Sequence, residues 1–256
     1  MLLTGASGGL GGAIARLLRR EGADLILSGR RVEALETLAH ELGARAVAAD
    51  LTRAEEVERL ADAAKDADIL VANAALPAAA PLQKLTIEEV DRALDVNLRA
   101  PIVLAHALLP RMIERRRGHL VFISSTGGKA AAAGNPLYHA TKFGLRGFAG
   151  GLRIDLHDAG VGVSCVLPGF ISEAGLFAES GVRLPFGVGT RAPEDVARAV
   201  AQAIERDRAE VQVAAPFLRG GTLLWNLAPD LASAVARRLG AGQIAQTYER
   251  ALQDKR

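Results

Sequence analysis

The sequence has little of what builds disulfide frameworks, metal sites or membrane spans. It holds one cysteine, Cys165, among 256 residues, so no internal disulfide can form, and a reducing compartment is favoured. Cys165 lies in an apolar run, where we expect a buried small residue. The five histidines show no paired ligand spacing, which argues against a metal. The longest uncharged stretch, residues 69–83, is interrupted by polar residues and prolines and is too short to span a bilayer.

The chain also lacks a charge bias toward polyanionic partners. It has 31 basic and 29 acidic residues, so nothing drives it globally toward nucleic acid or acidic membranes. No basic segment precedes an apolar core at the N-terminus, so no secretory signal is visible and we expect a cytoplasmic protein. Half of the residues are apolar, which suits one large domain with a full core.

Short apolar runs alternate with helix-period segments along most of the chain. Such runs are typical of parallel strands covered on both faces, and the alternation favours right-handed crossovers. We therefore predict an α/β fold, a single Rossmann-like doubly wound parallel sheet of about seven strands with helices on both faces. The expected strands are 2–4, 24–28, 45–49, 68–72, 119–124, 161–166 and 210–214. The expected helices are 9–21, 31–42, 53–65, 86–116, 137–158 and 193–208.

Two places depart from this alternation. The first strand is very short because three residues precede Thr4, so the native start lies upstream or the strand is truncated. After Ala214 the alternation stops. We expect residues 1–215 to form a dinucleotide-binding catalytic domain and residues 216–256 to form a helical extension packed on the same domain.

A glycine-rich turn follows the first expected strand and opens a helix. Glycines let the backbone turn tightly and approach a pyrophosphate, and the helix N-terminus offers free N–H groups to the phosphates. A simple loop is the alternative, but the position at the first strand-to-helix junction favours nucleotide binding. The contacts expected there are Gly5, Ser7, Gly9, Leu10 and Gly11.

The end of the second strand predicts which nucleotide binds. An NAD site places a carboxylate there for the ribose hydroxyl, whereas this chain has Gly29 followed by Arg30 and Arg31. A guanidinium can bind a 2′-phosphate, so NADP(H) is favoured, with Arg30 the stronger candidate; an exposed helix start is the other interpretation. After the third strand, Asp50 and Leu51 could reach the adenine, or Asp50 could cap a helix.

Tyr138 and Lys142 stand four residues apart and therefore share one helix face. A nearby cation favours phenolate and would lower the tyrosine pKa. The bare spacing is common, but Ser125 lies thirteen residues upstream, at the edge of the sheet where doubly wound folds bind ligands. Asn97 stands within a long helix, just before an expected break at Pro101, and an asparagine there needs a reason such as a bound water.

These motifs together resemble the short-chain dehydrogenase/reductase family from Thr4 to about Gly169. Thr4, Gly5, Gly9 and Gly11 match its glycine motif, and Asn97, Ser125, Tyr138 and Lys142 match its tetrad. The resemblance implies that Tyr138 is the general acid/base and that Ser125 forms a hydrogen bond to the substrate oxygen. It further implies that Lys142 holds the nicotinamide ribose and lowers the tyrosine pKa, and that Asn97 positions a water. It also implies NADP(H) binding at Arg30 and a nicotinamide contact at Pro168 and Gly169.

Three departures from the family pattern stand out. The family's Asn-Asn-Ala-Gly motif corresponds to residues 72–75, where Asn73 is the one asparagine kept. We expect this change to weaken the support of the sheet and of the cofactor edge modestly rather than to abolish it. The threonine expected after Gly169 is replaced by Glu173, with Ser172 beside it, and the frequent C-terminal ending is absent.

The segment after residue 216 gives a weaker indication of the substrate. Leucines and a valine recur at helical spacing, at Leu224, Leu227, Leu231, Val235 and Leu239. We interpret them as a helix packing on the domain or on a second subunit; a substrate lid or a lipid-facing surface are the alternatives. With Leu176, Phe177 and Phe186, this segment would suit an apolar ketone, aldehyde or alcohol.

The sequence therefore predicts an NADP-dependent oxidoreductase that interconverts a carbonyl and an alcohol. Family resemblance suggests a homodimer or homotetramer through the helices at 86–116 and 137–158. Two rivals remain: a sugar-nucleotide epimerase or dehydratase, which usually carries a larger C-terminal region, and an NADP(H)-binding sensor or scaffold without turnover.

Overall fold

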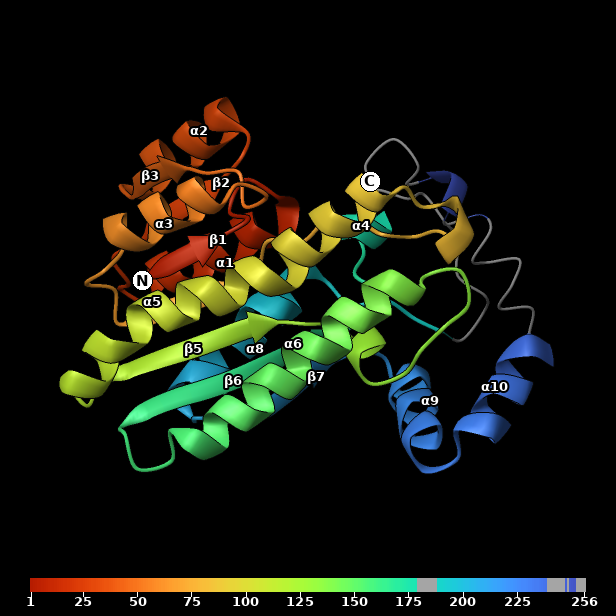
Figure 1. Cartoon of the computed structure of the whole chain (residues 1–256). Coiled ribbons are helices and arrows are strands. Elements are labelled where there is room, and N and C mark those ends of the chain that lie inside the picture. The colour runs from red at the N-terminus through yellow and green to blue at the C-terminus, as the bar shows by residue number, and fades with distance from the viewer. Residues whose placement is uncertain (179–187, 239–246, 248, 252–256) are drawn as a thin grey trace.

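Seven parallel strands form the centre of the molecule (Figure 1). The computed structural model describes residues 1–178, 188–238, 247 and 249–251. The strand order is β3-β2-β1-β4-β5-β6-β7, and each neighbouring pair is parallel. The strands are β1 (Leu2–Thr4), β2 (Ile26–Gly29), β3 (Arg45–Ala48), β4 (Ile69–Ala72), β5 (Gly118–Ile123), β6 (Val161–Pro168) and β7 (Glu210–Val213).

Helices cover both faces of this sheet (Figure 1). One layer holds α1 (Gly9–Arg20), α2 (Val32–Leu42) and α8 (Pro193–Glu205). The other holds α3 (Ala54–Ala63), α5 (Ala100–Glu114) and α6 (Pro136–Asp155). Strand residues alternate between the two layers: Leu2 packs with α3 and α5, whereas Leu3 packs with α1 and α8. The predicted fold class is confirmed.

The predicted elements agree closely with the observed ones, apart from the helix expected at 86–116. There α4 (Ile87–Leu94) continues through a π-helical turn (Asp95–Arg99) into α5. The expected break at Pro101 is wrong, because the wide turn lets the Ala100 N–H reach the Asp95 carbonyl and places the proline in the first turn of α5.

Residues 216–238, the continuous described segment that follows β7, form two helices rather than the one expected. Helix α9 (Pro216–Leu227) ends before Pro229, and α10 (Pro229–Arg238) follows at an angle (Figure 1). The expected apolar stripe therefore does not share one buried face: Leu227 is 76% exposed and Leu231 55%. Leu239 and Phe186 lie outside the described residues, as does the Leu176 side chain. Within the described ranges, no helix has the length and apolar character to cross a membrane.

Candidate active site

The turn between β1 and α1 brings two loops together. Gly5 has φ +67°, and a Cβ there would lie 2.8 Å from the Ala74 Cα, so a side chain would separate the loops after β1 and β4. Asn73 joins the same loops, since its Nδ2 donates to the Thr4 carbonyl at 3.0 Å. The α1 N-terminus, capped by Gly8 without a side-chain hydrogen bond, has no acidic residue in its first turn. Its N–H groups are available to an anion.

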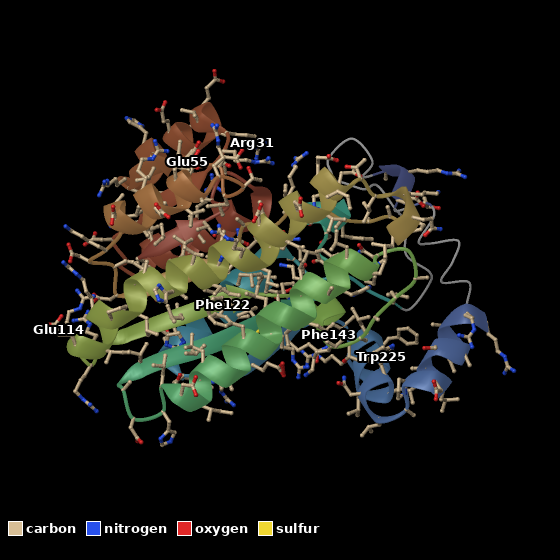
Figure 2. The ribbon with its side chains drawn as sticks, in the orientation of Figure 1. Arg31, Glu55, Glu114, Phe122, Phe143 and Trp225 are labelled. Carbon is tan, nitrogen blue, oxygen red and sulfur yellow. The ribbon has the colours of Figure 1, made fainter. Side chains whose placement is uncertain are left out.

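The end of β2 carries no side chain, and the Ser7 hydroxyl occupies the space beside it. A Cβ on Gly29 would lie 2.6 Å from the Ser7 Oγ, so this position accepts no larger residue without a shift. Arg30 and Arg31 follow, both exposed. Arg31 donates to the Ser7 carbonyl (Figure 2 labels Arg31 at this edge), whereas Arg30 has no hydrogen bond or ion pair within the described residues.

Asp50 makes a local turn after β3. Its Oδ1 accepts hydrogen bonds from the Thr52 backbone N–H at 3.0 Å and from the Thr52 hydroxyl at 2.9 Å. Helix α3 begins after Arg53, so Asp50 caps this turn rather than the helix. Leu51 lines the main cavity and Asp50 does not. The adenine contact at Asp50 stays a prediction.

Ser125 lies two residues after the end of β5 and caps the short 3₁₀ turn (Thr126–Gly128) that precedes α6. Its Oγ accepts the Gly127 N–H at 3.0 Å and donates to the Pro168 carbonyl at the end of β6, at 3.3 Å. A hydrogen bond from Ser125 also lowers the pKa of Tyr138, although burial has the larger, opposite effect and leaves that pKa raised. The hydroxyl of Ser125 and the phenol of Tyr138 are therefore neighbours.

Lys142 is 2% exposed and is held by the sheet. Its Nζ donates to the Ile123 carbonyl at 2.9 Å and lies 5.7 Å from the centre of the Tyr138 ring. Burial lowers the pKa of Lys142 to about 8. In the chain alone, burial leaves the pKa of Tyr138 raised, and the lowering of that pKa by Lys142 stays a prediction.

His139, beside Tyr138, shapes the wall of the site. Its Nδ1 lies 2.8 Å from the Gly127 carbonyl, and its Nε2 accepts the Ala132 N–H at 2.9 Å, so the neutral ring with hydrogen on Nδ1 satisfies both. Burial lowers the pKa of His139, in keeping with this form. Among the described residues, no cluster of histidine, cysteine or acidic side chains could hold a metal.

Asn97 is fully buried in the π-helical turn, away from the cavity lining. Its Oδ1 accepts the Leu76 N–H at 2.7 Å, and its Nδ2 donates to the Leu76 carbonyl at 2.9 Å. Asn97 therefore fixes the loop after β4. That backbone role is what the sequence did not reveal; the expected water contact stays a prediction.

A cavity of about 960 Å³ joins these features. Of the residues expected to bind or react, it is lined by Gly5, Ser7, Gly9, Leu10, Gly11, Arg30, Leu51, Asn73, Ser125, Tyr138, Lys142, Pro168 and Gly169. Its far end is apolar and includes Phe177, Leu218 and Trp225. Phe143 of α6 and Trp225 of α9 point toward one another in Figure 2, with ring centres 5.9 Å apart, and so tie α9 to the catalytic region.

The loop after β6 approaches the glycine-rich turn. Ile171 pairs with Arg191, and the ring centres of Phe170 and Phe177 lie 4.8 Å apart. A Cβ on Gly9 would lie 2.7 Å from the Ala174 Cβ, so this loop rests against the start of α1. Ser172 donates its hydroxyl to the Arg191 carbonyl at 3.3 Å, and Glu173 is exposed.

Arg92, Asn135 and Trp225 also line the cavity, and sequence reasoning did not select them. Arg92 stands among Glu88, Glu89 and Asp95 at helical spacing, which resembles an ordinary solvated surface. Asn135 precedes α6, and its buried Oδ1 has no hydrogen-bond partner within the described part of the chain. The single tryptophan was a signal that could have been used, since it stands between leucines of the C-terminal segment.

Comparison with known proteins identifies the family of this chain. The family model for short chain dehydrogenase matches residues 1–181. The chain belongs to the short-chain dehydrogenase/reductase family. It is 36% identical over 252 residues to an uncharacterized oxidoreductase of Myxococcus xanthus, covering 93% of this chain and 96% of that protein. It is 32% identical over 256 residues to the ketoacyl reductase HetN of a Nostoc species, covering 96% of this chain and 85% of that protein.

Solved structures of the same family share the fold. A short-chain dehydrogenase from Sphingobium yanoikuyae in complex with NADPH is 28% identical, with a TM-score of 0.76, and covers 82% of this chain and 86% of its own. The bulky-bulky ketone specific alcohol dehydrogenase from Comamonas testosteroni is 25% identical, with a TM-score of 0.74, covering 82% and 84%.

Short-chain dehydrogenases use a nicotinamide cofactor, and the residues present here fit one. The glycine-rich turn leaves room for a close backbone approach, and the α1 N-terminus offers N–H groups. No described residue lining the cavity is acidic, which suits a polyanionic ligand.

Proposed function

We propose that this protein is an NADP(H)-dependent oxidoreductase that interconverts an apolar ketone or aldehyde with the corresponding alcohol, with Tyr138 as general acid/base. The observation that carries the proposal is the shared cavity. Ser125, Tyr138 and Lys142 open into the space that the glycine-rich turn also lines, and that space continues into an apolar end. A dinucleotide and a small carbonyl compound could therefore meet at the phenol.

Cofactor binding rests on the first half of the sheet. Gly5, Ser7, Gly9, Leu10 and Gly11 would hold the phosphates, and Asn73, Pro168 and Gly169 would border the nicotinamide half. Preference for NADP(H) rests on Gly29, which places no carboxylate at the end of β2, and on Arg30, whose guanidinium makes no hydrogen bond or ion pair within the described residues. The name of one relative supports this preference: the NADP-dependent 3-hydroxy acid dehydrogenase YdfG of Salmonella typhi, 39% identical over 178 residues.

Residues of the chain itself would transfer the proton to and from the substrate oxygen. The nicotinamide, when bound, supplies or accepts the hydride. Ser125 donates a hydrogen bond to the carbonyl oxygen and orients it toward the phenol. Burial raises the pKa of Tyr138, so the phenol keeps its proton and can act as the acid during reduction. Alcohol oxidation needs the reverse transfer, which positive charge near the phenol would assist, and Lys142 is placed to provide part of it.

The apolar end of the cavity supports an apolar substrate. Phe170, Phe177, Leu218, Leu224 and Trp225 line it. The names of the ketoacyl reductase and of the bulky ketone specific dehydrogenase agree with a carbonyl substrate of some size. We also propose that residues 216–256 act with the catalytic domain of residues 1–215, because α9 and α10 form this wall.

A homodimer or homotetramer through α5 and α6 is part of the proposal. Gly147, Gly150 and Gly151 of α6 would meet nothing within 4 Å if they carried a Cβ, and Ile154 is 77% exposed. A second copy could pack closely on this face. Location in the cytoplasm stays an expectation from the sequence.

The deciding measurement is NADPH oxidation with a panel of apolar ketones and aldehydes. Turnover that Tyr138→Phe abolishes would support the proposed enzyme. Tight NADPH binding without turnover on the panel would favour the alternative, an NADP(H)-binding sensor or scaffold.

A further inference from the structure

One cation in the cavity has no part in the chemistry above. Arg92 lies on α4, is partly buried and lines the cavity. Within the described residues, its guanidinium has no hydrogen bond and no carboxylate within 4.0 Å. Glu88 and Asp95 stand about one helical turn away, and no ion pair joins either of them to Arg92 in the described part of the chain. A guanidinium that lines a cavity without a partner from the chain can accept an anion from outside it, through charge and parallel hydrogen bonds.

The charges around the cavity are one-sided. Its described lining holds Arg30, Arg31, Arg92 and Lys142 and no aspartate or glutamate. The first two follow β2, at the nucleotide end, and Arg31 already binds the Ser7 carbonyl. Lys142 is bound to the Ile123 carbonyl beneath the phenol. Of the four basic residues in the described lining, Arg92 is the one that lies on α4, apart from the two arginines that follow β2.

The position of Arg92 associates it with the substrate. Its neighbour Ala93 packs in a small apolar cluster with Ala78 and Leu137, and Tyr138 contacts this cluster from α6. One turn further along the helix, Val96 also lines the cavity. Arg92 therefore lines the cavity from α4, the helix whose Ala93 packs in the cluster that Tyr138 contacts.

We propose that Arg92 binds an anionic group of the substrate, so that the preferred substrate is an apolar carbonyl compound bearing a carboxylate or a phosphate. That the anion belongs to a substrate rests on the proposed function; that Arg92 binds an anion does not. A guanidinium can hold either group through two parallel hydrogen bonds, while the apolar wall receives the chain.

The test uses Trp225, the single tryptophan, which lines the same cavity. Its fluorescence is recorded while octanoate, octyl phosphate or octanamide is added to the full chain saturated with NADP⁺. We expect at least one anion to bind more tightly than the neutral amide. Arg92→Gln should weaken the binding of that anion about tenfold or more, as expected for the loss of a charged hydrogen bond, and should leave the affinity for octanamide unchanged. Arg92→Lys should retain part of the difference. Arg99→Gln, which removes an exposed charge outside the cavity lining, is the matched control.

The comparison of octanoate with octyl phosphate decides which anion is preferred. Equal affinity of the wild-type protein for all three probes would overturn the proposal, as would an Arg92→Gln effect equal on all of them. NADPH oxidation with an oxo-acid and its methyl ester separates the two proposals. Reduction of both compounds with equal efficiency keeps the proposed function and removes the role of Arg92. Arg92-dependent anion binding without any turnover would keep the anion site at Arg92 and remove the proposed function.

Discussion

Asn97 and Leu76 are joined by a reciprocal pair of hydrogen bonds. The asparagine carboxamide accepts from the Leu76 N–H and donates to the Leu76 carbonyl, at 2.7 and 2.9 Å, and its own exposure is 0%. The pair connects the π-helical turn between α4 and α5 to the loop that follows β4. Leu76 lines the cavity, so this link positions one of its walls.

Asn97→Leu should destabilise the fold, since it leaves two buried backbone groups of Leu76 without partners. We expect a loss of about 2–5 kcal/mol in the free energy of unfolding, measured by urea denaturation with saturating and without NADP(H). Asn226→Ala is the control, because Asn226 is exposed and its bond to the Lys129 carbonyl at 3.0 Å lies at the surface. A loss below about 1 kcal/mol for Asn97→Leu would contradict this role.

Tyr138→Phe should lower kcat for carbonyl reduction by about a hundredfold or more, because the substrate oxygen loses its proton donor. The dissociation constant of NADPH should change little, since the ring and its packing remain. Ser125→Ala should give a smaller loss, in keeping with an orienting hydrogen bond. Turnover within about threefold of the wild type in Tyr138→Phe would remove the tyrosine from the proposed mechanism.

Arg30→Ala should weaken NADPH binding about tenfold or more and should hardly change NADH binding, because the guanidinium would bind the 2′-phosphate that only NADPH carries. Arg31→Ala should weaken both cofactors together, since Arg31 bonds the Ser7 carbonyl of the glycine-rich turn. Arg20→Ala, at the far end of α1, is the control. Equal effects of Arg30→Ala on the two cofactors would refute the assignment.

Acidification should unfold the protein partly through His119. This residue is 6% exposed, its Nε2 lies 2.8 Å from the Ser164 Oγ, and burial lowers its pKa to about 4. Its folded pKa lies below the unfolded value near 6.5, so its contribution is intact above pH 6.5 and is lost as the pH falls toward 4. Between pH 7 and 4.5 the wild-type protein should lose about 2 kcal/mol more stability than His119→Gln. Parallel losses in both proteins would show that His119 titrates normally.

Trp225→Ala should raise KM for a long apolar ketone by about tenfold at most and leave KM for a short one nearly unchanged. The reason is that Trp225 forms part of the apolar wall and packs on Phe143. Leu223→Ala is the matched control, because Leu223 is 62% exposed on the same helix and does not line the cavity. Equal changes for both ketones would indicate a general loosening of α9.

Local patterns were sufficient to predict the sheet, because the inner strands β1, β4, β5 and β6 are apolar and largely buried, and the glycine-rich junction after β1 marks a turn. They also brought the glycine-rich turn, Ser125, Tyr138 and Lys142 to one edge, since parallel strands end at the same side. Pro101 was misleading, because a single proline is compatible with either a break or a wide turn, and only the bonding of Asp95 and Ala100 decides between them.

Other features depend on distant contacts that no local pattern contains. The orientation of Arg92 into the cavity, away from three nearby acids, is set by the packing of α4 on α6. The raised pKa of Tyr138 follows from burial among several elements. Desolvation of the phenol depends on how all of these elements enclose it, and the spacing of Tyr138 and Lys142 does not contain that information.

The cavity walls follow one another along the chain. In the proposed function, residues 5–51 would supply most of the nucleotide end, residues 123–142 most of the reacting groups, and residues 170–236 most of the apolar wall. Because the last group sits largely on α9 and α10, changes there can alter which molecules are accepted while hydride and proton delivery stay intact. Substrate range can therefore evolve, or be engineered by grafting, as a nearly independent trait.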